Sequence, residues 1–217
     1  MIGRFASASR RLAALGLTAS LLAGGCAGKS ARGELGAPAD ATEWDSRLGL
    51  VFDDRYTAVP VELTGRAPID VMDQRRFSQR MGYADLVVLV TVDQVWSRGL
   101  HGGDPQQRLD VTLGEVLLGE LPKGTELAQV LRIRGNAQAD PLPAALIGQV
   151  MLLFVRWAPG ERPAYHHHVM PADAEAVDWI QSMVRHARAE GKLPSEGAKS
   201  RASRRAQRKA ARAARAG

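Results

Sequence analysis

The chain has 217 residues, of which 45% are hydrophobic and 24% are charged. This is the composition of an ordinary globular protein, and it excludes a wholly disordered chain and a polytopic membrane protein. The single cysteine, Cys26, excludes an intramolecular disulfide and any metal site with several cysteine ligands.

The formal net charge of +6 is unevenly distributed along the chain. Residues 1–25 contain three Arg and no acidic residue, and residues 199–217 contain eight basic residues and no acidic one. The intervening residues 26–198 therefore hold 18 basic and 23 acidic residues, which gives them a net charge of −5. The sequence indicates an acidic body with a basic tail rather than a uniformly basic protein.

Residues 1–25 have the three parts of a secretory signal peptide. Basic residues near the start precede the apolar stretch 12–22, and small residues follow it. The apolar stretch is too short for a membrane-spanning helix, which needs about 20 residues. An amphipathic helix of the mature fold is the alternative, but residues 12–17 have no polar face.

The only cysteine stands directly after this signal. The sequence Leu22-Ala23-Gly24-Gly25-Cys26 resembles the lipobox of bacterial lipoproteins, in which a leucine and two small residues precede the lipidated cysteine. The resemblance implies lipid attachment at Cys26. Because Ala27 rather than an aspartate follows, it also implies sorting to the outer membrane of the cell envelope. In the family the leucine usually stands where this chain has Ala23, and ordinary signal cleavage after Ala27 is the alternative.

After the cysteine, the chain divides into a tether and a body. Residues 26–46 are rich in Ala, Gly and Ser, which predicts a flexible lipidated tether. Residues 47–192 are long enough to form one β-rich globular domain around a single core. Within residues 47–64, short apolar segments on either side of Pro60 predict one or two strands. Residues 69–82 predict a helix, since apolar and polar positions recur three or four residues apart.

The rest of the body predicts consecutive strands followed by a helix. The predicted strands are 86–92, 109–118, 130–134, 150–155 and 163–170, and the predicted helix is 172–189. In the second strand the apolar positions change parity across Gly114, which predicts a β-bulge. The predicted fold class is α+β and mainly β: a small, partly open antiparallel barrel or sandwich with flanking helices and a disordered basic tail.

Three short segments also resemble secreted OB-like domains of the netrin and metalloproteinase-inhibitor type. They are residues 84–88, 115–120 and 152–155, and the resemblance covers about residues 84–157. Those inhibitors work through an N-terminal cysteine on a metal and through disulfides. This chain has one cysteine, so the inhibitory activity is not implied. Such barrels carry many functions, and the fold alone selects none of them.

Three consecutive histidines lie in the last predicted strand. Strand alternation places His166 and His168 on one face, about 7 Å apart, where two imidazoles can share a metal ion. A complete site needs at least one more ligand, and the sequence nominates none reliably. The alternative is one packed histidine and two surface histidines. Asp53 and Asp54 are interpreted as a solvated turn rather than as an acid/base pair.

The sequence contains none of the common catalytic or nucleotide-binding motifs. G-x-S-x-G, H-E-x-x-H, G-x-x-x-x-G-K-[ST] and G-x-G-x-x-G are all absent. We therefore predict a protein that is not an enzyme and has no cofactor and no stoichiometric metal. A metal-dependent enzyme built around His166 and His168 is the alternative.

The basic tail, residues 193–217, has its arginines on one side of a potential helix. At 100° per residue, six of them share that side. They are Arg201, Arg204, Arg205, Arg208, Arg212 and Arg215. Like charges four residues apart repel, so we expect the free tail to be disordered and to become helical on a polyanion. A purely solubilising tail is the alternative.

These observations predict an outer-membrane-anchored lipoprotein that is a binding or structural module at the cell envelope. Its expected partners are the membrane, through the lipid at Cys26, and anionic envelope polymers or head groups, through the tail. No nucleic acid is expected, because an exported protein does not meet it. A nucleic-acid-binding protein would require that the chain is never exported.

Overall fold

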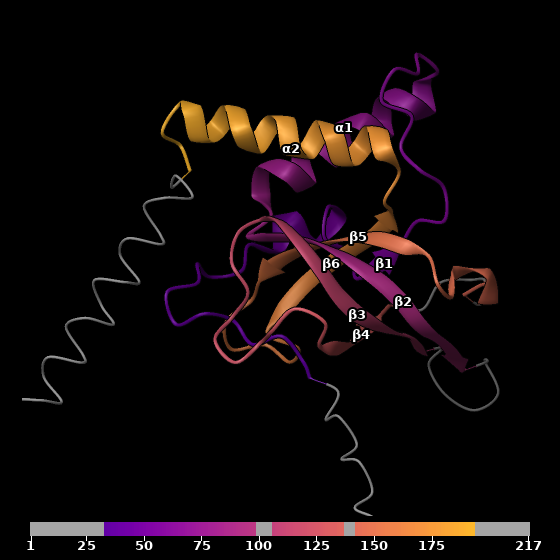
Figure 1. Cartoon of the computed structure of the whole chain (residues 1–217), viewed down its shortest axis with the longest axis vertical. Helices are drawn as coiled ribbons and strands as arrows, with labels where there is room; N and C mark the ends of the chain where they lie inside the picture. Colours follow the sequence, from indigo (N-terminus) through magenta and orange to yellow (C-terminus); the bar gives the residue numbers. More distant parts are fainter. Residues whose placement is uncertain (1–32, 99–105, 137–141, 194–217) are drawn as a thin grey trace, which may run out of the picture. The chain divides into compact units, whose positions relative to one another are not determined.

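The computed structural model describes residues 33–98, 106–136 and 142–193 (Figure 1). The predicted signal peptide, Cys26 and the tail from residue 194 onward lie outside these residues. The described strands are β1 (Arg55–Tyr56), β2 (Leu86–Arg98), β3 (Gln106–Leu118), β4 (Val130–Gly135), β5 (Val150–Trp157) and β6 (Tyr165–Pro171). The described helices are η1 (Ser46–Leu50), α1 (Pro68–Tyr83), η2 (Ala144–Leu146) and α2 (Ala174–Ala189).

The strands form one curved sheet in the order β1-β6-β5-β2-β3-β4. All neighbours from β6 to β4 are antiparallel, and only the short β1 runs parallel to its neighbour β6. The predicted fold class is therefore confirmed: the sheet curls into a half-barrel that carries flanking helices. At one end of the half-barrel, the backbone N–H of Asn136 after β4 donates to the carbonyl oxygen of Asp54 before β1 at 2.7 Å.

The predicted bulge lies where the parity of the sequence changes. Val90 of β2 pairs with Leu113, and Val88 pairs with Val116, so β3 contributes one extra residue between these pairs. A Cβ added to Gly114 would lie 3.0 Å from the carbonyl oxygen of Leu89, which is why the smallest residue stands here. Two more register shifts in the same pair of strands increase the curvature of the sheet.

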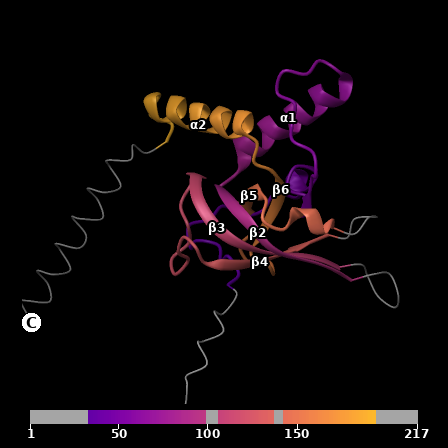
Figure 2. The same cartoon turned by 45° about the vertical axis from the view of Figure 1, so that its right-hand side comes forward.

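The two faces of the sheet form two hydrophobic cores. The concave face encloses side chains from β2 to β6, including Val90, Val111 and Leu153. The opposite face packs Leu152 and Phe154 against the helices. Figures 1 and 2 show α1 and α2 on this same side of the sheet. Because β5 is covered on both faces, it is apolar at nearly every position.

Both predicted helices form, and each buries only some of its apolar residues. α2 begins at the N-cap Asp173, whose carboxylate accepts the Ala176 N–H at 2.8 Å. Its buried side chains are Ala176, Ile180 and Val184, whereas Met183 is 45% exposed. In α1 the described buried residues are Phe77 and Arg80, and Ile69 and Met72 are exposed. The apolar residues of α1 therefore do not form a continuous buried stripe.

The segment around residue 50 differs from its prediction. The apolar residues Leu48, Val51 and Phe52 were expected in a strand, but they lie in η1 and the turn after it. Asp45 begins η1 by accepting the Arg47 N–H at 3.0 Å. Val51 and Phe52 still reach the helix-side core. The strand prediction failed here because a 3-10 turn aligns residues three apart, so Leu48 and Val51 reach the same core without an extended backbone.

The folded body begins earlier in the chain than residue 47. Gly33 forms a bridge with Leu131 of β4, and the backbone of Gly33 exchanges hydrogen bonds with Val130 and Arg132. Leu35 is 2% exposed and belongs to the concave core. Gly33 thus covers part of the outer edge of β4, and the segment 33–46, which the composition places in the tether, packs against the body.

Candidate functional site

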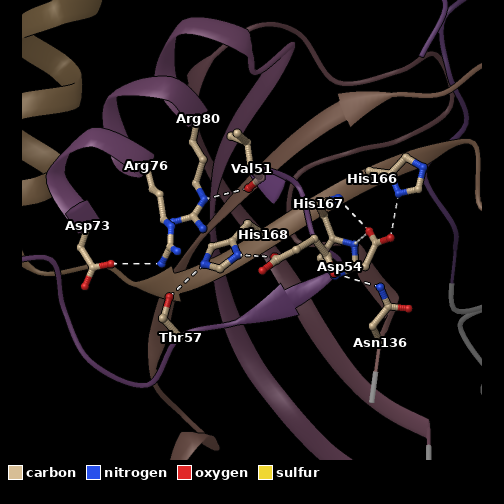
Figure 3. Close-up of polar contacts among 11 residues, drawn as sticks. Val51, Asp54, Thr57, Asp73, Arg76, Arg80, Asn136, His166, His167 and His168 are labelled. Carbon is tan, nitrogen blue, oxygen red and sulfur yellow. Dashed lines mark hydrogen bonds and ion pairs between the residues drawn. The ribbon is translucent and has the colours of Figure 1, made fainter. Parts of the chain in front are cut away.

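The three histidines of β6 face a pair of aspartates that precede β1. β1 pairs with β6 so that Arg55 lies opposite His168, and this places Asp53 and Asp54 beside the histidine segment. Figure 3 shows Asp54 next to His166 and His167, whereas His168 lies farther along the cluster, toward Thr57. Residues more than 110 positions apart in the sequence therefore form one polar cluster.

On the helix-side face of β6, His166 and His168 each use both ring nitrogens in hydrogen bonds. His166 Nδ1 lies 2.7 Å from Asp54 Oδ2, and its Nε2 lies 3.0 Å from Glu161 Oε2. The ring also stacks on Trp44, with 4.1 Å between the ring centroids. His168 is 2% exposed and is oriented from both ends. Its Nδ1 lies 2.7 Å from Asp53 Oδ1, and its Nε2 lies 2.9 Å from Thr57 Oγ1.

On the concave face, His167 packs beside Tyr165, as strand alternation predicts. Its backbone N–H donates to Asp54 Oδ1 at 2.9 Å. Its ring Nδ1 is 3.0 Å from the same oxygen, but the contact does not have hydrogen-bond geometry. One carboxylate thus contacts two adjacent histidines on opposite faces of the strand, and it fixes the position of β1 against β6.

Asp54 also connects this cluster to the far edge of the half-barrel. Its φ of 54° lies in the left-handed region, which aspartate and asparagine tolerate better than most residues. Its carbonyl oxygen accepts the N–H of Asn136, and a Cβ on Gly135 would lie 2.9 Å from that oxygen. Glycine at residue 135 therefore permits β4 to approach Asp54 closely.

Burial and pairing act in opposite directions on the charges of this cluster. Burial raises the pKa of Asp53, but the hydrogen bond and charge of His168, together with the charge of Arg80, leave that pKa below its ordinary value. Burial also raises the pKa of Asp54, and the neighbouring His167 and His166 more than offset it. Burial lowers the pKa of His168, and the nearby Arg80 lowers it further against the effect of Asp53. Both carboxylates are therefore ionised at neutral pH, and His168 is neutral.

The aspartates are not the solvated turn that the sequence suggested. The side chains of Asp53 and Asp54 are 30% and 19% exposed, and each carboxylate binds at least one histidine. The interpretation was wrong because charge at two adjacent polar residues reveals nothing about a partner more than 110 residues away. The two-residue strand β1 that brings them together is too short to be read from the sequence.

The metal-site alternative depends on the same histidines. His166 and His168 share a face, but their four ring nitrogens are occupied by Asp54, Glu161, Asp53 and Thr57. Within residues 33–98, 106–136 and 142–193, no group of three or more His, Cys, Asp or Glu side chains has the geometry to hold a metal ion. The cluster instead has the geometry of carboxylate-oriented imidazoles.

A second feature is an arginine-lined groove on the outer surface of β2, β3 and β4. Its lining residues are Trp96, Gln107, Arg108, Arg132, Arg134 and Gly135. The guanidinium of Arg108 lies 5.0 Å above the ring of Trp96, which is 40% exposed. Asp110, which is 1% exposed, lies 3.5 Å from Arg108 and 3.3 Å from Arg132. A single buried carboxylate therefore orients two of the arginines that line this groove.

The predicted lipid and polyanion sites cannot be placed in the fold. Cys26 and the six tail arginines Arg201, Arg204, Arg205, Arg208, Arg212 and Arg215 lie outside the described residues. Among the residues that are described, no helix combines the length and the apolar character needed to cross a bilayer.

Comparison with known proteins adds no family to these observations. The chain matches no protein-family model, and no curated protein matches its sequence.

Sequence reasoning located the histidines but missed their partners and the arginine groove. Arg132 and Arg134 lie on the outer side of β4, because they alternate with the buried Leu131 and Ile133. Arg108 and Trp96 join them through the pairing of β2, β3 and β4. The groove follows from the pairing of the three strands, and the sequence of any one strand does not reveal it.

Proposed function

We propose that this protein is a lipid-anchored binding module of the bacterial outer membrane, and that its body binds an anionic ligand at the envelope surface. The observation that carries the proposal is the groove of Arg108, Arg132 and Arg134 beside Trp96. The body as a whole is acidic, with a net charge of −5 over residues 26–198, so a cluster of three arginines on one surface stands out.

The groove is suited to anions because its cations are held in place and remain accessible. Asp110 forms ion pairs with Arg108 and Arg132 and so restrains both side chains. Arg134 is 66% exposed and lies 3.3 Å from Glu34. Guanidinium groups bind phosphate and carboxylate through paired N–H donors, and the exposed Trp96 ring offers a flat surface for a sugar or head group. The ligands that fit are anionic lipid head groups and acidic envelope polymers.

The two ends of the chain support the same location. A lipidated Cys26 would hold the body at a membrane, and the eight basic residues of 199–217 would add a second attraction. Each basic residue close to an anionic surface contributes about 1 kcal/mol, screened over a Debye length of about 8 Å. The proposed role is binding rather than catalysis, and the proposal includes no cofactor.

The test uses the full chain with Cys26→Ser, so that binding does not depend on the lipid. Its sedimentation with anionic vesicles is compared with that of a variant with Arg108, Arg132 and Arg134 changed to Gln. A matched control changes three exposed arginines elsewhere on the body, namely Arg47, Arg66 and Arg75, to Gln. Weaker binding of the groove variant, with the binding of the control variant unchanged, supports the proposal, and equal losses in both variants refute a role for the groove.

A third variant, lacking residues 199–217, separates the tail from the groove. We expect the tail deletion and the groove variant each to weaken binding, and the combination to abolish it. Binding to neutral vesicles should be absent throughout, and high salt should release the protein from anionic ones. Retention of full binding after both changes would contradict an electrostatic role for either region.

A further inference from the structure

A cleft with a volume of about 540 Å³ lies where the beginning of the described body faces the connection between β5 and β6. One wall comes from residues 34–36 and from the neighbouring β4, and the other comes from residues 161–164 and the start of β6. The polar side chains that line the cleft are Glu34, Arg132, Arg134, Glu161, Arg162 and Tyr165. Small-ligand sites commonly have volumes of about 300–1,000 Å³, so this cleft is large enough for a small molecule.

Both walls of the cleft carry charges of both signs. On the first wall, Arg134 Nη2 lies 3.3 Å from Glu34 Oε1, and these side chains are 66% and 52% exposed. On the second wall, Glu161 and Arg162 are both exposed. Ion pairs between exposed side chains contribute little to stability, so Arg134 and Glu34 can turn to a ligand at small cost.

The histidine cluster positions the carboxylate of the second wall. Glu161 Oε2 lies 3.0 Å from Nε2 of His166, whose Nδ1 lies 2.7 Å from Asp54 Oδ2. The same ring stacks on Trp44, with 4.1 Å between the ring centroids. Glu161 therefore contacts a ring that is itself held by two other residues. Because a carboxylate accepts several hydrogen bonds, Glu161 can hold a ligand donor as well.

Tyr165 adds a buried phenol to the lining of the cleft. The residue is 2% exposed, and its ring packs against Trp157 and His167 in the concave core. Burial raises the pKa of the Tyr165 hydroxyl well above its ordinary value, and the charges of Glu34 and Asp54 raise it further. The hydroxyl therefore keeps its proton at neutral pH and can donate it to a ligand oxygen.

We propose that this cleft binds a zwitterionic ligand of the amino-acid or short-peptide class. A ligand with only negative charge would meet Glu34 and Glu161, and one with only positive charge would meet three arginines. An apolar ligand would remove water from these ionised groups without replacing their hydrogen bonds. A ligand carboxylate on the guanidinium groups and a ligand ammonium on the glutamates would satisfy both signs at once.

The experiment is an NMR titration of the full Cys26→Ser chain with the dipeptide alanylalanine. Two analogues are titrated in parallel: the N-acetylated dipeptide, which lacks the ammonium, and the dipeptide amide, which lacks the carboxylate. Each analogue has lost one hydrogen-bonded charge, so we expect each to bind about tenfold more weakly than the dipeptide.

Two matched double variants assign the binding to the cleft. The first changes Glu34 and Glu161 to Gln, and the second changes the exposed Glu43 and Glu115, which do not line the cleft, to Gln. We expect the affinity for the dipeptide to fall about tenfold in the first variant and to change less than about twofold in the second. The affinity for the N-acetylated dipeptide should not fall in either variant, because this analogue has no ammonium for the glutamates to hold.

Binding to anionic vesicles distinguishes this cleft from the arginine groove, since Arg132 and Arg134 line both. The variant without Glu34 and Glu161 should bind the vesicles at least as well as the parent chain, because it has lost two negative charges beside the groove. Equal affinities for the dipeptide and its N-acetylated form, equal dipeptide affinities in the two double variants, or no saturable binding of the dipeptide would overturn the inference. Each of these results is independent of whether the vesicles bind.

Discussion

Replacing Asp54 with Ala tests whether one carboxylate fixes the edge of the half-barrel. In the native protein this carboxylate accepts the N–H of His167 at 2.9 Å and pairs with His166 Nδ1 at 2.7 Å. The residue also adopts a φ of 54°, which is unfavourable for alanine. The substitution therefore removes two hydrogen bonds to a charged group and adds backbone strain at the same position.

The expected loss follows from these three terms. Hydrogen bonds to a charged group contribute about 1.5 kcal/mol each at the low end, and a left-handed alanine costs about 1 kcal/mol. We therefore expect Asp54→Ala to lower the free energy of unfolding by about 4 kcal/mol. Asp54→Gly removes the same hydrogen bonds without the strain, so its loss should be about 1 kcal/mol smaller. Asp54→Asn keeps an acceptor for the His167 N–H and tolerates the φ value, and its loss should be about 2 kcal/mol.

The assay is equilibrium urea unfolding of the full Cys26→Ser chain, followed by tryptophan fluorescence. Asp40→Ala is the matched control, because Asp40 is exposed and its removal changes the net charge equally. This control should change the free energy of unfolding by less than about 0.5 kcal/mol. A loss below about 1 kcal/mol in Asp54→Ala, or the same loss in Ala and Asn variants, would refute the role assigned to this carboxylate.

Three further predictions concern acid stability, metal binding and the start of the folded body. The folded-state pKa of His168 lies below its usual value, so its contribution to stability is present above about pH 6.5 and is lost as pH falls through the folded pKa. The folded-state pKa of Asp53 also lies below its usual value, so its contribution to stability is present above about pH 4 and is lost as the pH falls further. Each pH unit between the folded and unfolded pKa values corresponds to about 1.4 kcal/mol of stability per group. Urea midpoints measured from pH 8 to pH 3 should therefore decrease steadily, and a maximum near pH 5 would contradict this. Elemental analysis of the purified protein should find no stoichiometric transition metal, whereas one zinc per chain that is lost in the double variant His166→Ala, His168→Ala would revive the metal-site alternative. Leu35→Ala should lower the free energy of unfolding by about 2–4 kcal/mol because Leu35 is 2% exposed, and no change would show that residues 33–46 act only as a tether.

Much of the fold could be predicted because its long elements have strong local patterns. β5 is apolar at successive positions, and β3 changes parity at Gly114, so both the central strand and the bulge are evident in the sequence. The helix α2 is indicated by Asp173 and the apolar residues that follow it. These signals are local, and tertiary contacts reinforce them.

The site could be predicted only in part because it depends on contacts between distant segments. The alternation of β6 correctly separates His167 from His166 and His168. Nothing near Asp53 indicates that a two-residue strand will place it against β6. Likewise, the burial of Arg80 follows from the docking of α1 on the turn that contains Val51, and helix periodicity does not reveal it.

The proposal that the protein is anchored through Cys26 is tested most directly by the mass of its mature N-terminus. The protein is expressed in a diderm bacterium, extracted from the membrane fraction and digested, and the N-terminal peptide is analysed by mass spectrometry. We expect a peptide that begins at Cys26 and carries acyl chains. A peptide that begins at Gly28 without acyl mass, or an intact Met1, would contradict it.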